Sequence, residues 1–218
     1  MTSPSDLMAR IEGSLLDPRL TPAEAVARLR SWEDLGLVHV IAPPGLLAVL
    51  EPETHPGVSF AGAVAFPSGG STLANKRMEL LECVRLGAKA ATAVLSPSLV
   101  LSSAVSALEK EMAALLSTAP ELQVRFLVDV ARVPEGPMTL LLRLLKACRP
   151  SHLVPADGVY SAPCGPVEVA RLRARLPRKV RVMALADPNG PNEASAYLDS
   201  GADMLCTANP ECLVGAVP

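Results

Sequence analysis

Cysteine and histidine side chains are examined first, because thiolates and imidazoles most often bind metals or attack substrates. The chain has five cysteines and three histidines, widely spaced along the sequence: Cys83, Cys148, Cys164, Cys206, Cys212, His39, His55 and His152. None of the cysteines forms a C-x-x-C pair, so the sequence predicts neither a zinc site nor a disulfide framework. We expect no bound metal and no cofactor.

Two cysteines, Cys164 and Cys206, come near the carboxyl ends of predicted strands and are candidate nucleophiles. Neither has a histidine close in sequence, although His39 and His152 are predicted strand residues that the fold could bring near them. The alternative is a small buried thiol in a reducing compartment. The sequence favours this alternative for both residues.

The functional interpretation depends on Ser151–Gly165, SHLVPADGVYSAPCG. His152–Val154 is predicted to be a short buried strand. Pro155 ends its pairing, because proline lacks a backbone N–H and has a fixed φ. Ala156-Asp157-Gly158 then has the composition of a tight turn. A proline, which has no titratable group, therefore holds the position directly after this strand.

Eight predicted strands alternate with helices along the chain. The strands are expected at Ile11–Leu15, Leu37–Ile41, Ser59–Phe66, Ala90–Leu95, Val124–Asp129, His152–Val154, Val180–Ala184 and Met204–Cys206. A long helix is expected after the fourth strand, because Leu101, Val105, Leu108, Met112 and Leu115 recur at helical spacing. Such alternation favours parallel strands covered by helices, and eight units favour a (β/α)8 TIM barrel. An open, doubly wound sheet is the alternative.

The composition is typical of one such domain. Half of the 218 residues are hydrophobic and only 3% are aromatic, which indicates a core of alanine, leucine and valine under covering helices. We expect a single barrel domain over residues 1–218, in which residues 1–8 are flexible.

Several function classes are not expected. The net charge is −2 and lysine and arginine do not cluster, so the sequence predicts no nucleic-acid partner. No uninterrupted apolar run approaches the roughly 18 residues of a membrane span. The first residues, MTSPSDLMARIEG, lack the basic and apolar segments of a signal peptide. We expect a cytoplasmic protein with no membrane partner.

Taken together, these segments resemble the deoxyribose-phosphate aldolase family over nearly the whole chain. The motifs, in the family's order, are IEGSLLDP at Ile11–Pro18, FPSG at Phe66–Gly69 with Lys76 after it, LGAK at Leu86–Lys89 and SGAD at Ser200–Asp203. The resemblance implies an eight-stranded barrel. The family catalyses a reversible aldol reaction through a lysine Schiff base. A second lysine lowers the pKa of the first, and a carboxylate moves protons.

The positions that match the family's catalytic residues mostly hold other residue types. They are Glu12, Thr92, Arg125, Asp129, Pro155 and Met183. Pro155 stands at the Schiff-base lysine and Met183 at the second lysine. Glu12 and Asp129 retain a carboxylate at the family's first-strand and fifth-strand acids, while Arg125 replaces a lysine and Thr92 an aspartate. The resemblance therefore implies the family's fold with a degenerate catalytic site.

The loops that hold phosphate in the family also differ. Its Gly-Gly after the seventh strand is Asp187-Pro188-Asn189-Gly190 here, and its last-strand G-T-S-S is Cys206–Asn209. An added negative charge and a proline without an N–H do not suit an anion that backbone N–H groups must hold. We expect no phosphate ligand.

Lys76 is the one lysine expected past the carboxyl end of a strand, and it is a candidate for a new amine catalyst. The family lysine that it matches is not the Schiff-base residue. Glu12 and Asp129 are candidates for a carboxylate pair in the barrel mouth. The alternative is that Arg125 or Lys76 neutralises them as a remnant of the older site.

We interpret the chain as a catalytically inactive aldolase-like protein, a pseudoenzyme with a binding, scaffolding or regulatory role. The alternative is an enzyme of altered, lyase or aldolase-like chemistry on a non-phosphorylated small molecule, using Glu12, Asp129, Lys76 or a cysteine. A mouth filled by Met183 and Pro155 would support the first interpretation. An open pocket with convergent polar groups would support the second.

The helix expected over about Met138–Cys148 carries more apolar surface than a barrel helix needs. Its apolar residues cover an arc of about 200° at 100° per residue, whereas a stripe of about 100° is enough for packing on one side. We expect self-association or a protein partner, with this helix as the candidate contact through Met138, Leu141, Leu142 and Leu145. The alternative is that neighbouring helices cover it.

Overall fold

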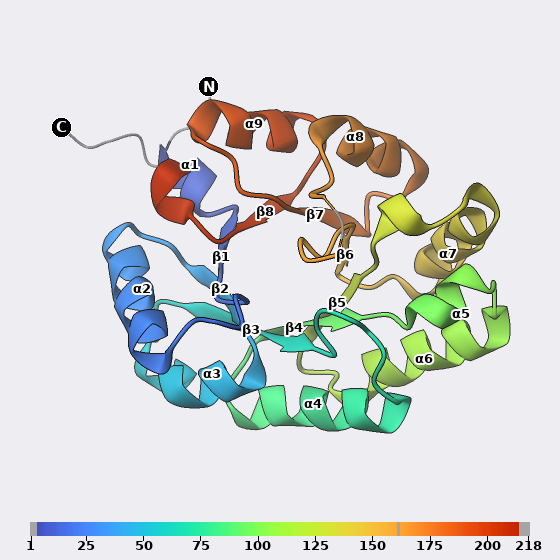
Figure 1. Cartoon of the computed structure of the whole chain (residues 1–218), viewed down its shortest axis with the longest axis horizontal. Helices are drawn as coiled ribbons and strands as arrows, with labels where there is room; N and C mark the ends of the chain where they lie inside the picture. Colours follow the sequence, from blue (N-terminus) through green and yellow to red (C-terminus); the bar gives the residue numbers. More distant parts are fainter. Residues whose placement is uncertain (1–3, 161, 214–218) are drawn as a thin grey trace.

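The computed structural model describes residues 4–160 and 162–213. Eight parallel strands form a closed barrel in sequence order, with β8 paired to β1 (Figure 1). The strands are β1 Ile11–Ser14, β2 His39–Ala42, β3 Ser59–Val64, β4 Ala90–Val94, β5 Gln123–Leu127, β6 His152–Val154, β7 Arg181–Leu185 and β8 Met204–Thr207. The predicted TIM barrel is confirmed, and the pairing of β8 with β1 excludes the open sheet.

The helices form a ring outside the strands (Figure 1). They are α1 Pro4–Met8, α2 Pro22–Asp34, α3 Pro44–Leu50, α4 Leu73–Arg85, α5 Pro97–Leu101, α6 Val105–Thr118, α7 Glu135–Cys148, α8 Pro166–Arg175 and α9 Pro191–Asp199, with 3-10 turns η1 Pro52–Thr54, η2 Val130–Arg132 and η3 Pro210–Leu213. Thr21 caps α2 in a capping box, in which its side chain accepts from the Glu24 N–H and the Glu24 carboxylate accepts from the Thr21 N–H.

The prediction of a single long helix after the fourth strand is wrong. The chain forms α5 and α6 instead, separated by Ser102–Ala104. Ser103 has a positive φ of 53°, which no α-helix accommodates. The Ser102 hydroxyl also donates to the Ser98 carbonyl and competes with helix propagation. Only the part of the predicted face that lies in α6 is therefore a buried helical stripe.

Apolar side chains form two separate cores. One lies between the strands and the ring of helices, and the other fills the inside of the barrel. The inner core contains small residues, including Ala61, Ala63 and Ala90, together with Leu127, Val154 and Met183. Both faces of these strands are thus buried, which explains why the strands are apolar runs without alternation.

The apolar surplus expected on α7 is covered within the chain. Met138, Leu141, Leu142 and Leu145 are all buried, and α7 packs against α5 and α6. The idea that this helix presents an unpartnered apolar sector is therefore wrong, because the neighbouring helices take up the additional arc. Association with a second copy or another protein remains a prediction and needs a different surface.

The amino-terminal residues pack on the barrel where the structure describes them. Residues 1–3 of the segment expected to be flexible lie outside the described residues. The rest forms α1, in which Leu7 and Met8 are buried. Within the described ranges, no helix has the length and apolar character needed to cross a membrane.

Candidate functional site

Side chains fill the inside of the barrel below its carboxyl end. The remaining cavity there is about 10 Å³, and it is lined mainly by apolar groups such as Leu127, Val154 and Met183. That volume holds one water molecule at most. Met183, in the middle of β7, is 1% exposed. Pro155 directly follows β6 and is buried, and its carbonyl accepts from the Val130 N–H.

A buried ion pair crosses the inside of the barrel, beneath these apolar side chains. Glu12 on β1 and Arg125 on β5 come from strands on opposite sides, and Arg125 Nη1 lies 2.5 Å from Glu12 Oε1. The same nitrogen is 3.7 Å from Met183 Sδ. Thr92 is buried with a hydroxyl that has no partner in the described part of the chain. Glu12 could have formed a carboxylate pair with Asp129 or an ion pair with a basic residue, and the structure has the ion pair with Arg125.

Asp129 does not join Glu12. It lies beyond the end of β5, where its Oδ2 pairs with Arg132 Nε at 3.2 Å. The expected carboxylate pair is therefore absent, because the carboxylates belong to different levels of the barrel: one lies inside it and the other in a loop above it.

Lys76 lies on α4, outside the barrel, and its side chain reaches the carboxyl end of β4 and Glu111 on α6. Its ammonium donates to the Val94 carbonyl at 2.8 Å, to Ser96 Oγ at 3.1 Å and to Glu111 Oε1 at 2.6 Å. All three ammonium hydrogens are used, and the side chain is fully buried. Glu111 was not singled out from the sequence. The available signal was an acidic residue within the apolar face of α6 that contains Leu108 and Met112.

The open part of the carboxyl end is an acidic pocket of about 480 Å³. It lies between the loops after β1, β6, β7 and β8, and Asp17, Asp157 and Asp187 line it. Arg19 is the cation in its described lining, and hydrogen bonds from Arg19 lower the pKa of Asp17 to about 2. The pocket therefore favours neutral or cationic groups over anions.

Carboxylates of the chain occupy the backbone donors in these loops. Asp187 Oδ1 accepts from Thr207 Oγ1 and from the Ala208 N–H, both at 2.8 Å. Asp157 Oδ1 accepts from the N–H groups of Val159 and Tyr160 at 2.6 and 2.7 Å. The loops after strands seven and eight of a barrel commonly use such donors to hold phosphate. Here the donors already have anionic partners.

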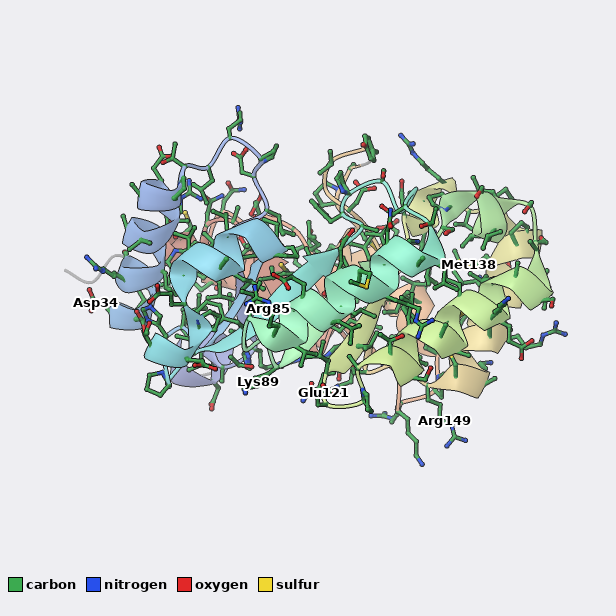
Figure 2. All side chains as sticks on the ribbon, turned by 90° about the horizontal axis from the view of Figure 1, so that it is seen from below. Asp34, Arg85, Lys89, Glu121, Met138 and Arg149 are labelled. Atoms are coloured by element: carbon green, nitrogen blue, oxygen red, sulfur yellow. The ribbon has the colours of Figure 1, made fainter. Side chains whose placement is uncertain are left out.

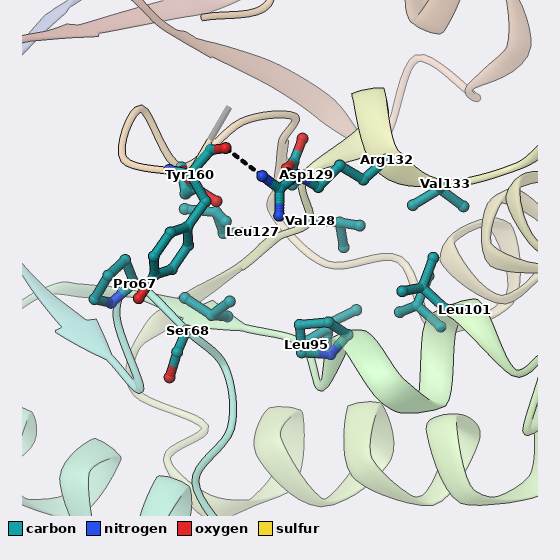
Figure 3. Close-up of a pocket in the computed structure, with 14 residues that line it drawn as sticks. Pro67, Ser68, Leu95, Leu101, Leu127, Val128, Asp129, Arg132, Val133 and Tyr160 are labelled. Carbon is teal, nitrogen blue, oxygen red and sulfur yellow. Dashed lines mark hydrogen bonds and ion pairs between the residues drawn. The ribbon is translucent and has the colours of Figure 1, made fainter. Parts of the chain in front are cut away.

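A second, smaller pocket of about 120 Å³ lies to the side, among the loops after β3 to β6 (Figure 3). Its walls are apolar and include Pro67, Leu95, Leu101 and Val128, as in Figure 3. Polar groups stand at one edge, where Arg132 donates to the Tyr160 carbonyl and pairs with Asp129. This pocket suits one small apolar group beside a charged pair.

The curated proteins that match this chain share one name. The chain is 27% identical over 214 residues to the deoxyribose-phosphate aldolase of Kocuria rhizophila, with 94% of each chain covered. It is 26% identical over 209 residues to that of Mycobacterium tuberculosis, with 94% of this chain and 88% of the relative covered. Over nearly its whole length the chain is therefore similar in sequence to deoxyribose-phosphate aldolases. No protein-family model matches it.

Solved structures carry the same aldolase-like fold. The deoxyribose phosphate aldolase of Aeropyrum pernix, described as a unique tetramer, superposes with a TM-score of 0.89 at 23% identity and covers 98% of this chain and 91% of its own. A protein described as QR15, an aldolase, superposes with a TM-score of 0.90 at 19% identity, covering 95% and 94%. At these identities the likeness establishes the fold alone.

No lysine of this aldolase-like barrel lines the pockets described at its carboxyl end. All five lysines lie in the described part of the chain. Lys89 and Lys179 precede β4 and β7, Lys110 and Lys146 are exposed on α6 and α7, and Lys76 is buried outside the barrel. The mouth therefore lacks the amine that Schiff-base chemistry requires.

The candidate cysteine nucleophiles of this aldolase-like chain are buried thiols. Burial raises the pKa of Cys206 well above its usual range and raises the pKa of Cys164 to about 11. Neither sulfur has a described histidine as a hydrogen-bond partner, because His39 and His152 line a pocket at the other end of the barrel. No group of three histidine, cysteine or acidic side chains able to hold a metal occurs among residues 4–160 and 162–213.

Proposed function

We propose that this aldolase-like barrel is a binding protein that does not carry out Schiff-base aldol chemistry. The observation that carries the proposal is the filled barrel interior beneath the acidic pocket, where Met183 holds the position of the second lysine. A cavity of about 10 Å³ over Met183 has no room for a sugar, and no lysine amine reaches it. Lys76, the remaining candidate amine, makes three hydrogen bonds outside the barrel.

The carboxyl-end loops argue against a sugar phosphate as ligand. A phosphate group would need the donors that Asp187 and Asp157 occupy, and it would approach three carboxylates in the acidic pocket. Repulsion between like charges makes that approach unfavourable. The same charge favours a partner that carries basic side chains.

The side pocket suggests how such a partner would be held. Its volume of about 120 Å³ is below that of common small-molecule sites, and it matches a single apolar side chain inserted from another protein. Leu101 and Tyr160, which line it, and the neighbouring Val159 are all exposed. An apolar anchor pocket with an exposed apolar rim is typical of protein interfaces. We infer a partner segment with one apolar anchor flanked by basic residues.

A pair of matched variants tests this partner site. Leu101 and Leu81 are both 46% exposed, but Leu101 lies in the side pocket and Leu81 on the outer side of α4. We expect Leu101→Asp to weaken binding of the native partner at least tenfold, equivalent to about 1.4 kcal/mol. Leu81→Asp is expected to leave it unchanged. The native partner would first be captured with the wild-type protein and identified, and its affinity for each variant would then be measured by titration. Equal effects of the two variants would exclude the side pocket.

The absence of aldolase chemistry is tested by trapping. Borohydride reduction in the presence of acetaldehyde should leave no adduct on any lysine by mass spectrometry, and deoxyribose 5-phosphate should not be cleaved. The K. rhizophila relative, treated in the same way, serves as the positive control. A stoichiometric adduct on Lys76, or turnover above the rate without protein, would overturn the proposal and favour the altered-chemistry enzyme.

A further inference from the structure

Basic side chains gather at the amino-terminal end of the barrel, away from the mouth. This end is marked in Figure 2 by Lys89, Glu121 and Arg149 along one edge, each in a segment that leads into a strand. A pocket of about 300 Å³ opens here. Its charged and titratable lining residues are Arg10, His39, Lys89, Arg125, His152, Arg181 and Asp203.

Apart from Arg125, which pairs with Glu12 inside the barrel, the positive charge of this pocket is largely uncompensated. Arg10 donates to the carbonyls of Ala202 and Asp203, which hold its side chain without neutralising it. Lys89 and Arg181 are exposed and have no side-chain partner among the described residues. Asp203 is the carboxylate in the lining, but it accepts from the Val182 N–H and lies 3.5 Å from Arg173.

Buried polar atoms at the inner end of the pocket also have no partner. His152 is 1% exposed, and its Nδ1 lies 3.1 Å from Ser151 Oγ. That hydroxyl donates to the Val124 carbonyl, so it accepts from Nδ1. His152 Nε2 and Arg125 Nε make no hydrogen bond in the described part of the chain. Buried polar groups normally have partners. Arg125 Nε is a donor without an acceptor, and His152 Nε2, which is an acceptor while the ring is neutral, becomes a second such donor when the ring is protonated.

We propose that this pocket binds a small oxyanion, a phosphate or carboxylate group, held by Lys89 and Arg181 at the rim and received by His152 and Arg125 at the inner end. Arginine and lysine are the side chains that form charge-assisted hydrogen bonds with such groups. The Arg10 side chain is already held by two carbonyls, so it adds positive charge to the pocket without losing side-chain conformational entropy when the anion binds. The site is separate from the partner site proposed above, so either can fail without the other.

Binding should be coupled to proton uptake. Burial, and then the charges of Arg125 and Arg181 and of His39, lower the pKa of His152 to about 3. Burial also lowers the pKa of His39, with Glu12 acting in the opposite direction and Arg125 in the same one. Both rings are therefore neutral in the empty site near neutral pH. An anion beside Arg125 and Arg181 offsets their charge and raises both pKa values.

Charge-neutralising variants at the rim provide the test. Binding of inorganic phosphate and of succinate would be measured by calorimetry at constant ionic strength in potassium chloride, for wild type, Arg181→Gln and Lys89→Gln. We expect saturable binding that each variant weakens about tenfold. Arg143→Gln and Lys146→Gln, at exposed positions of α7, remove the same charge and are expected to change affinity less than twofold. Tighter binding of phosphate or of succinate would identify the natural group.

The pH dependence would be read with sulfate, whose charge is constant over the range. A pKa raised by binding strengthens binding at low pH, so sulfate affinity should fall as the pH rises from about 5 to about 8. Absence of saturable binding by all three anions, or equal losses in the α7 variants, would overturn the site. A flat sulfate profile would overturn the proton uptake by His39 and His152.

Discussion

Replacing Lys76 by methionine is expected to lower the free energy of unfolding by about 3–5 kcal/mol, the cost of leaving one charge of a buried ion pair without its partner. Glu111 would stay buried with only Ser96 as a donor. Lys110→Met on the exposed side of α6 should change stability by no more than about 0.5 kcal/mol. Urea denaturation followed by circular dichroism gives both values.

The double variant separates charge from packing. In Lys76→Met with Glu111→Leu no charge is left buried between α4 and α6, so we expect most of the lost stability to return. Recovery would be incomplete, because Ser96 loses the carboxylate that accepts from its N–H and hydroxyl. A single variant as stable as wild type would mean that the Lys76 ammonium is free, and would restore it as a candidate catalyst.

Met183→Lys should be the most damaging single substitution at the degenerate site, and it should not create an aldolase. The new amine would lie in the barrel interior near Arg125, whose Nη1 is 3.7 Å from Met183 Sδ. We expect a loss of about 3–5 kcal/mol for this uncompensated buried charge. Met78→Lys, at a methionine that is 66% exposed, is the matched control and should be near neutral.

The stability of this variant should rise with pH. Burial and the neighbouring guanidinium lower the pKa of the new lysine in the folded state, so the unfolded chain binds more protons. Stability therefore increases from the folded-state pKa up to about 10.4, the usual lysine value, and is lost again as the pH falls. Urea midpoints near pH 7 and pH 10 would measure the difference. Wild-type stability together with a trapped imine would contradict the proposed function.

The fold was predictable because its elements are marked locally. Proline and glycine delimit the segments, apolar runs indicate strands buried on both faces, and His152–Val154 was predicted with the bounds that β6 has. The break between α5 and α6 was not predictable from hydrophobic periodicity, which runs through it. It depends on the positive φ of Ser103.

The candidate site was only partly predictable. Glu12 and Arg125 were identified, but their pairing follows from the closure of the barrel, which brings β1 opposite β5. The covering of α7 depends on how tightly α5 and α6 pack on it. The basic pocket at the amino-terminal end was missed because Arg10, Lys89 and Arg181 are single residues in distant segments. A search for runs of lysine and arginine cannot find such a set.

The Asp187 carboxylate, which accepts hydrogen bonds at the end of β8, competes with any free anion for these donors. This carboxylate is two residues beyond β7 and accepts from Thr207 and Ala208. A tethered group of this kind is present at an effective concentration of the order of millimolar or more. Any free anion must displace it before reaching the same donors, and its occupancy falls accordingly. We therefore expect the carboxyl end to remain occupied by the chain's own carboxylate at metabolite concentrations below that level.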